Sequence, residues 1–296
     1  MTSGISGDGA PILLGLIGRG IARSRSPAMH MAEARAQGLT LLYRVLDMDA
    51  PPRRGLDLAG MLAAAEAAGF DGLNVTHPFK TEVTGLLDEL SEEARAVGAV
   101  NTVLLRGGRR IGHNTDLWGF AESLRRGLAD APRGHVLLIG AGGAGGAVAY
   151  ALVRSGVARL SIHDSQLDRA EALADRLSAP GGGCAVRAIA DPAALIRDDR
   201  PDGIVNATPM GMAGHPGMAV APDLLGPGLW VADIVYVPLE TPLLAAARRA
   251  GCRVLPGAGM ALFQAVRAFE LFTGRSADPA RMRAAIERFD AGRARS

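Results

Sequence analysis

The chain has 296 residues, more than a typical single domain of about 100–200 residues, so two domains are expected. Its composition, 48% hydrophobic and 21% charged, is that of a globular protein with a core and excludes an extensively disordered chain. The formal net charge of +2 is too small for a nucleic-acid-binding surface but is compatible with an anionic small molecule.

The two cysteines, Cys184 and Cys252, are far apart in the sequence. They predict neither a disulfide framework nor a zinc site and favour a reducing, cytoplasmic compartment. The N-terminal segment has no basic residue before its short apolar run, which argues against a secretory signal. Residues 136–153 form an uncharged stretch, but its five glycines suit a strand, a turn and a helix start better than a membrane helix. We therefore expect neither a nucleic acid nor a membrane as a partner.

The first part of the chain alternates between strand and helix signals. Ser26-Pro27 predicts a helix start with Ser26 as the N-cap, and Gly38 predicts the end of that helix. In chain order the predicted elements are a strand at 12–17, the helix from Ser26, a helix ending at Gly69, a strand at 73–75, a helix from about Thr81, a helix capped by Ser91, and a hairpin of residues 100–105 and those after Arg110, turning at Gly107-Gly108.

From His135 the alternation becomes regular and predicts a parallel sheet. The predicted elements are a strand at 136–139, a helix to about Ser155, a strand at 160–163, a helix to Leu177, strands near Ala185, Ile204 and Trp230, and helical segments from Met260 and after Pro279. We expect a two-lobed α/β protein. An open α/β substrate-binding domain would cover 1–116, completed by C-terminal helices at 258–296, and a Rossmann domain with a doubly wound parallel sheet would cover 117–257.

A glycine-rich motif, Gly140-x-Gly142-x-x-Gly145, follows the strand at 136–139 and begins a helix. In a dinucleotide site the first glycine permits a tight turn, the second lets a pyrophosphate approach the backbone, and the third lets the helix pack on the strand. The helix N-terminus then offers free N–H groups to the phosphates. A purely structural glycine turn gives the same pattern, so the strand and helix around the motif carry the prediction.

Asp164 ends the next strand, at about the 20 residues beyond the motif where a carboxylate binds ribose hydroxyls. Because a carboxylate repels a 2′-phosphate, the sequence favours NAD over NADP. Two alternatives stay open. Asp164 or Ser165 could serve only as a cap of the following helix, and the nearby Arg169 keeps NADP as a cofactor in consideration.

Several motifs, spread over nearly the whole chain, resemble the shikimate dehydrogenase family. They are Ser24-Arg-Ser26-Pro27, Asn74-Val-Thr76-His-Pro78-Phe-Lys80, Ala99-Val-Asn101-Thr, His113-Asn114-Thr115-Asp116, Gly140 to Gly145, Asn206-Ala-Thr-Pro, Asp233-Ile-Val-Tyr236 and Gly259-Met-Ala-Leu-Phe-Gln264. The stretches Val205 to Met212 and Tyr236 to Thr241 are most similar to the NAD-linked quinate/shikimate branch.

The resemblance implies a role for each matching residue. Lys80 and Asp116 are the expected catalytic pair, because hydride loss from a secondary alcohol requires that the hydroxyl proton also leave. The residues expected to bind substrate are Ser24 and Ser26 at its carboxylate, Asn101 and Gln264 at its ring hydroxyls, and Thr76 and Tyr236. The residues expected to bind the dinucleotide are Gly140, Gly142, Gly143, Gly145, Asp164, Asn206, Thr208 and Gly259. Without the family motifs, we would interpret Ser26 and Asp116 only as helix caps and Lys80 only as a solvated side chain.

The activity that the resemblance implies is reversible oxidation of shikimate to 3-dehydroshikimate, or of quinate to 3-dehydroquinate, with NAD. We expect no metal, because the six histidines show no metal-binding spacing. Three alternatives remain: an NADP-dependent biosynthetic shikimate dehydrogenase, a paralogue that acts on an amino analogue of quinate or shikimate, and a non-catalytic dinucleotide sensor. The resemblance is also compatible with a homodimer.

Overall fold

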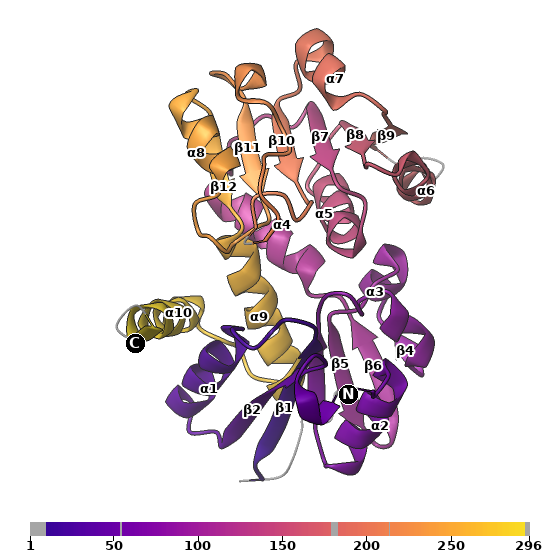
Figure 1. Cartoon of the computed structure of the whole chain (residues 1–296), viewed down its shortest axis with the longest axis vertical. Coiled ribbons are helices and arrows are strands. Elements are labelled where there is room, and N and C mark those ends of the chain that lie inside the picture. The colour runs from indigo at the N-terminus through magenta and orange to yellow at the C-terminus, as the bar shows by residue number, and fades with distance from the viewer. Residues whose placement is uncertain (1–9, 54, 179–182, 213, 294–296) are drawn as a thin grey trace. The chain divides into compact units, whose positions relative to one another are not determined.

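The computed structural model describes residues 10–53, 55–178, 183–212 and 214–293. They form two compact α/β units (Figure 1). Unit 1 contains the residues up to Thr115 and those from Leu262 onward, and unit 2 extends from Asp116 to Ala261. No helix in the described part of the chain is long and apolar enough to cross a membrane.

Unit 1 is built on a mixed sheet of six strands in the order β2-β1-β3-β5-β6-β4. β1 is parallel to both β2 and β3, whereas β5 is antiparallel to β3 and β6. Its elements are β1 (Ile12–Gly18), α1 (Ser26–Ala36), β2 (Leu41–Asp47), the 3-10 helix η1 (Pro51–Arg53), α2 (Leu58–Ala67), β3 (Gly72–Val75), the 3-10 helix η2 (Glu82–Leu86), β4 (Glu89–Leu90), α3 (Glu92–Val97), β5 (Thr102–Arg106), β6 (Arg109–His113), most of α9 (Ala258–Thr273) and α10 (Pro279–Arg293).

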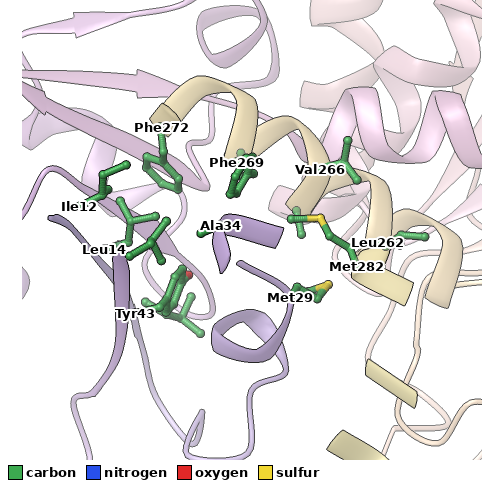
Figure 2. Close-up of a cluster of buried hydrophobic side chains, with 14 of the residues drawn as sticks. Ile12, Leu14, Met29, Ala34, Tyr43, Leu262, Val266, Phe269, Phe272 and Met282 are labelled. Carbon is green, nitrogen blue, oxygen red and sulfur yellow. The ribbon is translucent and has the colours of Figure 1, made fainter. Parts of the chain in front are cut away.

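The C-terminal helices complete a core of unit 1 (Figure 2). α9 buries residues at helical spacing on one face, including Phe269 and Phe272, against β1 and β2. Gly72 of β3 makes room for this packing, because a Cβ there would lie 2.4 Å from the ring of Phe272. An ion pair adds to the packing: Arg281 of α10 contacts the fully buried Glu33 of α1 at 2.6 Å.

Local signals gave several elements of unit 1 correctly. The β5–β6 hairpin turns through Gly107 and Gly108, whose φ values of +57° and +72° are those of a two-residue loop that favours glycine. Ser91 caps α3 as predicted, accepting a hydrogen bond from the amide of Ala94 at 3.2 Å.

Two expectations for unit 1 need correction, and two of its strands were not predicted. The N-cap of α1 is Arg25, and Ser26 is already the first helical residue. The helix predicted from Thr81 is only the short 3-10 helix Glu82–Leu86, in a segment where the glycine and β-branched residues are poor helix formers. The two edge strands of the sheet, β2 (Leu41–Asp47) and β4 (Glu89–Leu90), have no counterpart among the predicted elements.

Unit 2 contains a fully parallel sheet of six strands in the order β12-β11-β10-β7-β8-β9. The strand order reverses between β7 and β10, and this switch point is where Rossmann sheets bind ligands. The predicted α/β class with a doubly wound sheet is confirmed. The elements are α4 (Asp116–Gly127), β7 (His135–Ile139), α5 (Gly143–Arg154), β8 (Arg159–His163), α6 (Leu167–Leu177), β9 (Ala185–Ala188), α7 (Pro192–Asp199), β10 (Gly203–Asn206), the 3-10 helix η3 (Pro222–Leu224), β11 (Trp230–Asp233), α8 (Pro242–Arg249) and β12 (Arg253–Pro256).

Candidate functional site

The glycine-rich turn of unit 2 lies at the carboxyl end of β7. Gly140 has a φ of +107°, and a Cβ on it would lie 2.8 Å from the carbonyl of Ala207. A Cβ on Gly145 would lie 2.0 Å from the carbonyl oxygen of Gly140, so this glycine lets α5 approach the turn. At both positions a side chain would clash with the backbone of the protein itself, so the fold requires glycine there whether or not a ligand binds.

Gly142 differs from these two glycines. It is the N-cap of α5, has an ordinary φ of −74°, and a Cβ on it would meet no atom within 4 Å. It also supplies no side-chain acceptor to the first turn of α5, which begins at Gly143. The N–H groups of that turn therefore suit an anion such as a pyrophosphate.

Asp164 follows β8 and is bonded to the glycine-rich turn. One carboxylate oxygen accepts a hydrogen bond from the amide of Ala141 at 2.8 Å, and the other accepts one from the amide of Gln166 at 2.9 Å. The N-cap of α6 is Gln166, so neither Asp164 nor Ser165 caps that helix. Because a carboxylate has about four acceptor sites, Asp164 retains capacity for ribose hydroxyls.

Asn206 and Thr208 form the turn after β10, next to Gly140. The side-chain oxygen of Asn206 accepts hydrogen bonds from the amide and the hydroxyl of Thr208, at 3.0 and 2.7 Å. Its amide nitrogen donates to Asp233 at 3.0 Å and to the carbonyl of Met210 at 3.3 Å. Asn206 is fully buried, so its side chain supports the loop that carries the half-buried Thr208.

Asp233, at the end of β11, is the centre of this network and is 1% exposed. Its carboxylate also accepts hydrogen bonds from the amide of Val235 at 3.0 Å and from the hydroxyl of Thr241 at 2.7 Å. Burial raises the pKa of Asp233 above its ordinary value, although these hydrogen bonds act in the opposite direction. The sequence analysis includes Asp233 in a family motif but predicts no role for its side chain.

The remaining predicted residues of unit 2 occupy different settings. A Cβ on Gly259 would lie 2.2 Å from the hydroxyl oxygen of Ser123, so this glycine lets the first turn of α9 pack against α4. Asp116 is the first residue of α4 and is 5% exposed. Tyr236 lies in the loop after β11 and is 44% exposed.

In unit 1, Ser24 and Ser26 lie at the start of α1 and contact each other. The Ser24 hydroxyl oxygen accepts a hydrogen bond from the amide of Ser26 and lies 3.2 Å from the Ser26 hydroxyl, to which it donates. The hydroxyl of Tyr43, on β2, also hydrogen bonds to Ser26. Burial raises the pKa of Tyr43 far above its ordinary value, so this hydroxyl stays neutral.

Tyr43 connects the serines to Asn101 through Asn74. The Tyr43 hydroxyl donates to the side-chain oxygen of Asn74 at 2.7 Å, and the amide nitrogen of Asn74 donates to the carbonyl of Asn101 at 3.1 Å. Asn101, 3% exposed, donates from its side chain to the Thr115 hydroxyl at 2.9 Å. Three predicted substrate residues thus share one chain of hydrogen bonds, which is half-buried at the two serines and buried from Tyr43 to Asn101.

Thr76 and Lys80 lie in the segment after β3. The amide of Thr76 donates to the carbonyl of Ile17 at 2.9 Å, and the carbonyl of Lys80 accepts from the amide of Val100 at 2.7 Å. The backbone of Lys80 is therefore fixed beside the residue that precedes Asn101. Gln264 lies half-buried on α9.

Residues 10–53, 55–178, 183–212 and 214–293 contain no group of three His, Cys, Asp or Glu side chains that could hold a metal ion. Within these ranges, sequence reasoning missed Tyr43, Asp47 and Thr241, which support the predicted residues. No motif spacing marked them, because their roles depend on contacts between strands that are distant in the sequence.

The parallel sheet, its glycine-rich turn and the acid after the second strand define a dinucleotide-binding protein of the Rossmann class. Residues 16–103 match the family model "Shikimate dehydrogenase substrate binding domain", and residues 257–287 match "Shikimate 5'-dehydrogenase C-terminal domain". A "Quinate/shikimate dehydrogenase (NAD(+))" of Corynebacterium efficiens is 52% identical over 274 residues, 92% of this chain and 96% of that protein. The chain therefore belongs to the shikimate/quinate dehydrogenase family, whose members are oxidoreductases that act on a secondary alcohol.

Two further relatives differ in the cofactor that they are named for. A "Shikimate dehydrogenase (NADP(+))" of Streptomyces avermitilis is also 52% identical, over 93% of this chain and 94% of that protein. The solved structure of a quinate dehydrogenase from Corynebacterium glutamicum in complex with NAD has a TM-score of 0.86 and 50% identity, covering 93% of this chain and 98% of that chain. Overall similarity alone therefore does not separate the two cofactors.

Proposed function

We propose that this protein is an NAD-dependent dehydrogenase that reversibly oxidises shikimate to 3-dehydroshikimate and quinate to 3-dehydroquinate. The polyol carboxylate is bound by Ser24, Ser26, Thr76, Asn101, Tyr236 and Gln264. Unit 2 holds the dinucleotide through the turn at Gly140 to Gly145 and the loop at Thr208. Asn206 and Gly259 act in this proposal by shaping the backbone around them.

The residues present fit a dinucleotide. The open space at Gly142 and the N-terminus of α5 suit the pyrophosphate, and the carboxylate of Asp164 suits the ribose hydroxyls. A bound NAD supplies the hydride acceptor for alcohol oxidation. Because Asp164 is an anion beside that ribose, it also disfavours the 2′-phosphate of NADP.

One observation carries the catalytic assignment: Lys80 is the only lysine in the chain, although lysine and arginine together number 32. Arginine supplies positive charge everywhere else, but a guanidinium does not give up its proton in proteins. The chain uses arginine in preference to lysine at every other basic position. We infer that lysine is retained at position 80 because an amine that both accepts and donates a proton is needed there.

Lys80 accordingly accepts the hydroxyl proton during oxidation and returns it during reduction. Asp116 is the second member of the proposed catalytic pair and accepts a hydrogen bond from a substrate hydroxyl. The charge of Lys80 matters less than its proton transfer, so Lys80→Arg and Lys80→Ala should both lose activity.

The test measures initial rates at the nicotinamide absorbance band with shikimate or quinate and NAD or NADP, in all four pairings. We expect activity with NAD, and a fall of about 10²–10⁴-fold in kcat for Lys80→Ala and for Lys80→Arg, with dinucleotide binding retained. Full activity of Lys80→Arg would contradict the proton-transfer role. Activity only with NADP would contradict the role of Asp164, and binding of NAD without turnover of either acid would favour an amino analogue as substrate or a sensor.

The proposal includes a cytoplasmic location. Cys184 and Cys252 are both free, which suits a reducing compartment. The small-molecule substrate is the proposed partner, together with a second copy of the chain in a homodimer. Light scattering on the purified protein gives the mass in solution and tests the homodimer directly.

A further inference from the structure

Asp47, the last residue of β2, has a carboxylate that is saturated with backbone hydrogen bonds. One oxygen accepts from the amides of Gly20 and Asp49, both at 3.1 Å, and the other accepts from the amides of Ile21 at 2.9 Å and Ala22 at 3.1 Å. The residue is 8% exposed. Three of the four donors belong to the loop that joins β1 to α1.

That loop carries Ser24. The amide of Ser24 donates to the carbonyl of Ile21 at 2.9 Å, so the turn held by Asp47 continues directly into the serine. Gly20, Ala22 and Arg23 are exposed, and the half-buried Ile21 is the residue of this loop that packs on the apolar core. Charge-assisted bonds to a buried carboxylate are the strong restraint on its shape.

The other end of the same loop contacts the segment that carries Thr76 and Lys80. The amide of Arg19 donates to the carbonyl of His77 at 3.1 Å, and the Arg19 guanidinium lies 5.6 Å from the ring centre of Phe79. Arg19 also pairs with Asp49 at 2.6 Å, two residues beyond Asp47. Asp47 and Asp49, at and just after the end of β2, thus hold the loop that lies between the two serines and the segment from Thr76 to Lys80.

We infer that Asp47 is a positioning residue that fixes the hydroxyls of Ser24 and Ser26 for the carboxylate of the substrate. It acts through the backbone of Gly20 to Ala22 and makes no substrate contact itself. This inference rests on the proposed function, because it concerns the acid group of the proposed polyol carboxylate. An asparagine cannot replace Asp47, since in either orientation its NH2 group would face at least one loop amide instead of accepting from it.

The test compares Asp47→Asn with Asp71→Asn. Asp71 is a matched control, because its carboxylate also accepts a backbone hydrogen bond in unit 1, from Leu13 at 2.8 Å, but near the start of β1 and not its end. We expect Asp47→Asn to raise the KM for shikimate by about 10- to 100-fold, the scale of a small misplacement of binding groups. Its kcat at saturation and its KM for NAD should change by less than about threefold, and Asp71→Asn should leave all three constants unchanged.

Two readouts separate positioning from general destabilisation. Hydrogen exchange of the amides of Gly20 to Ala22 should accelerate in Asp47→Asn without any ligand present, and it should stay slow in Asp71→Asn. In competition experiments, Asp47→Asn should lose less affinity for the methyl ester of shikimate than for shikimate itself, because the ester lacks the anionic carboxylate. An equal loss of affinity for the acid and the ester would overturn the inference. Unchanged hydrogen exchange of the amides of Gly20 to Ala22 would also overturn it.

Gly20→Ala provides a second variant if Asp47→Asn folds poorly. Gly20 has a φ of +65°, and a Cβ on it would meet no atom within 4 Å, so alanine strains the loop without touching the core. It should also raise the KM for the acid selectively, and an unchanged KM in this variant would contradict the inference. If the wild-type protein turns over neither acid, the proposed function fails, whereas the exchange measurement still reports whether Asp47 holds the loop.

Discussion

The carboxylate of Asp164 accepts a hydrogen bond from the backbone amide of Ala141 at 2.8 Å. This bond joins the end of β8 to the glycine-rich turn after β7. The side chain proposed to select NAD therefore also holds the turn that is proposed to bind the pyrophosphate. Substitutions that remove the charge and the acceptor separately distinguish these two roles.

Asp164→Asn keeps an oxygen for the amide of Ala141 but loses the charge. We expect its preference for NAD over NADP, expressed as the ratio of kcat/KM values, to fall by about tenfold or more, since a hydrogen bond to a charged group contributes roughly 1.5–3 kcal/mol. Its melting temperature should fall only slightly, because the NH2 group replaces only the oxygen that accepts from the exposed amide of Gln166. Asp164→Ala should lower both the ratio and the melting temperature, because it also leaves the amide of Ala141 without its partner. An unchanged ratio in both variants would show that Asp164 serves the turn alone.

Gly142 and Gly145 belong to one motif but should respond differently to alanine. Gly142→Ala meets open space at an ordinary φ, so the free energy of unfolding should fall by no more than about 1 kcal/mol, the scale of placing alanine at an N-cap. Its KM for NAD should nevertheless rise, because the new methyl group occupies the approach of the pyrophosphate. Gly145→Ala places a Cβ against the carbonyl oxygen of Gly140 and should destabilise the fold itself. Urea unfolding and NAD titration of both variants check this, and a large loss of stability in Gly142→Ala would contradict it.

Asp233 should make stability depend on pH in an unusual direction for an aspartate. Because burial raises its pKa above the ordinary value of 3.8, the native protein retains this proton to a higher pH than the unfolded chain does. Its contribution to the free energy of unfolding therefore falls as pH rises from about 3.8 through the raised pKa. Asp233→Asn lacks this titration, so the stability of the variant relative to wild type should improve between about pH 4 and pH 7.

Urea unfolding at several pH values in this range measures that difference. Asp71→Asn is again the control, since it removes a carboxylate of unit 1 that lies outside the Asn206 network. A relative stability of Asp233→Asn that worsens with rising pH would mean that the three hydrogen bonds outweigh the burial of the charge.

Local sequence signals predicted the parts of this fold that depend on neighbouring residues. The glycines of the β5–β6 hairpin and the Ser91 cap act within a few residues of themselves, and the glycine-rich motif is read correctly because a strand and a helix flank it. β2 was missed because its sequence, LLYRVLD, shows no clean alternation: buried and exposed residues alternate only in its first half. An edge strand of this kind is recognised mainly by its pairing with β1.

The supporting residues of the site could not be predicted for a related reason. Asp47 lies 25 to 27 residues from the loop amides that it accepts, and Asn206 lies 27 residues from Asp233. Such pairs are brought together by parallel strands, whose partners are separated by a helical crossover of variable length. The resemblance to a family gave the residues that contact ligands, whereas the side chains that hold them in place became visible only in the structure.

Most of α9 and all of α10 belong to unit 1, although they follow unit 2 in the chain. During synthesis, every residue of unit 2 leaves the ribosome before Phe269, Phe272 and Met282, which complete the core around β1 and β2. The segment made first is therefore finished last, in contrast to the usual order in which an N-terminal domain folds while the rest is translated. Until those helices emerge, the apolar residues of α1, β1 and β2 that pack against them stay uncovered, and exposed apolar surface of this kind favours aggregation of a nascent chain.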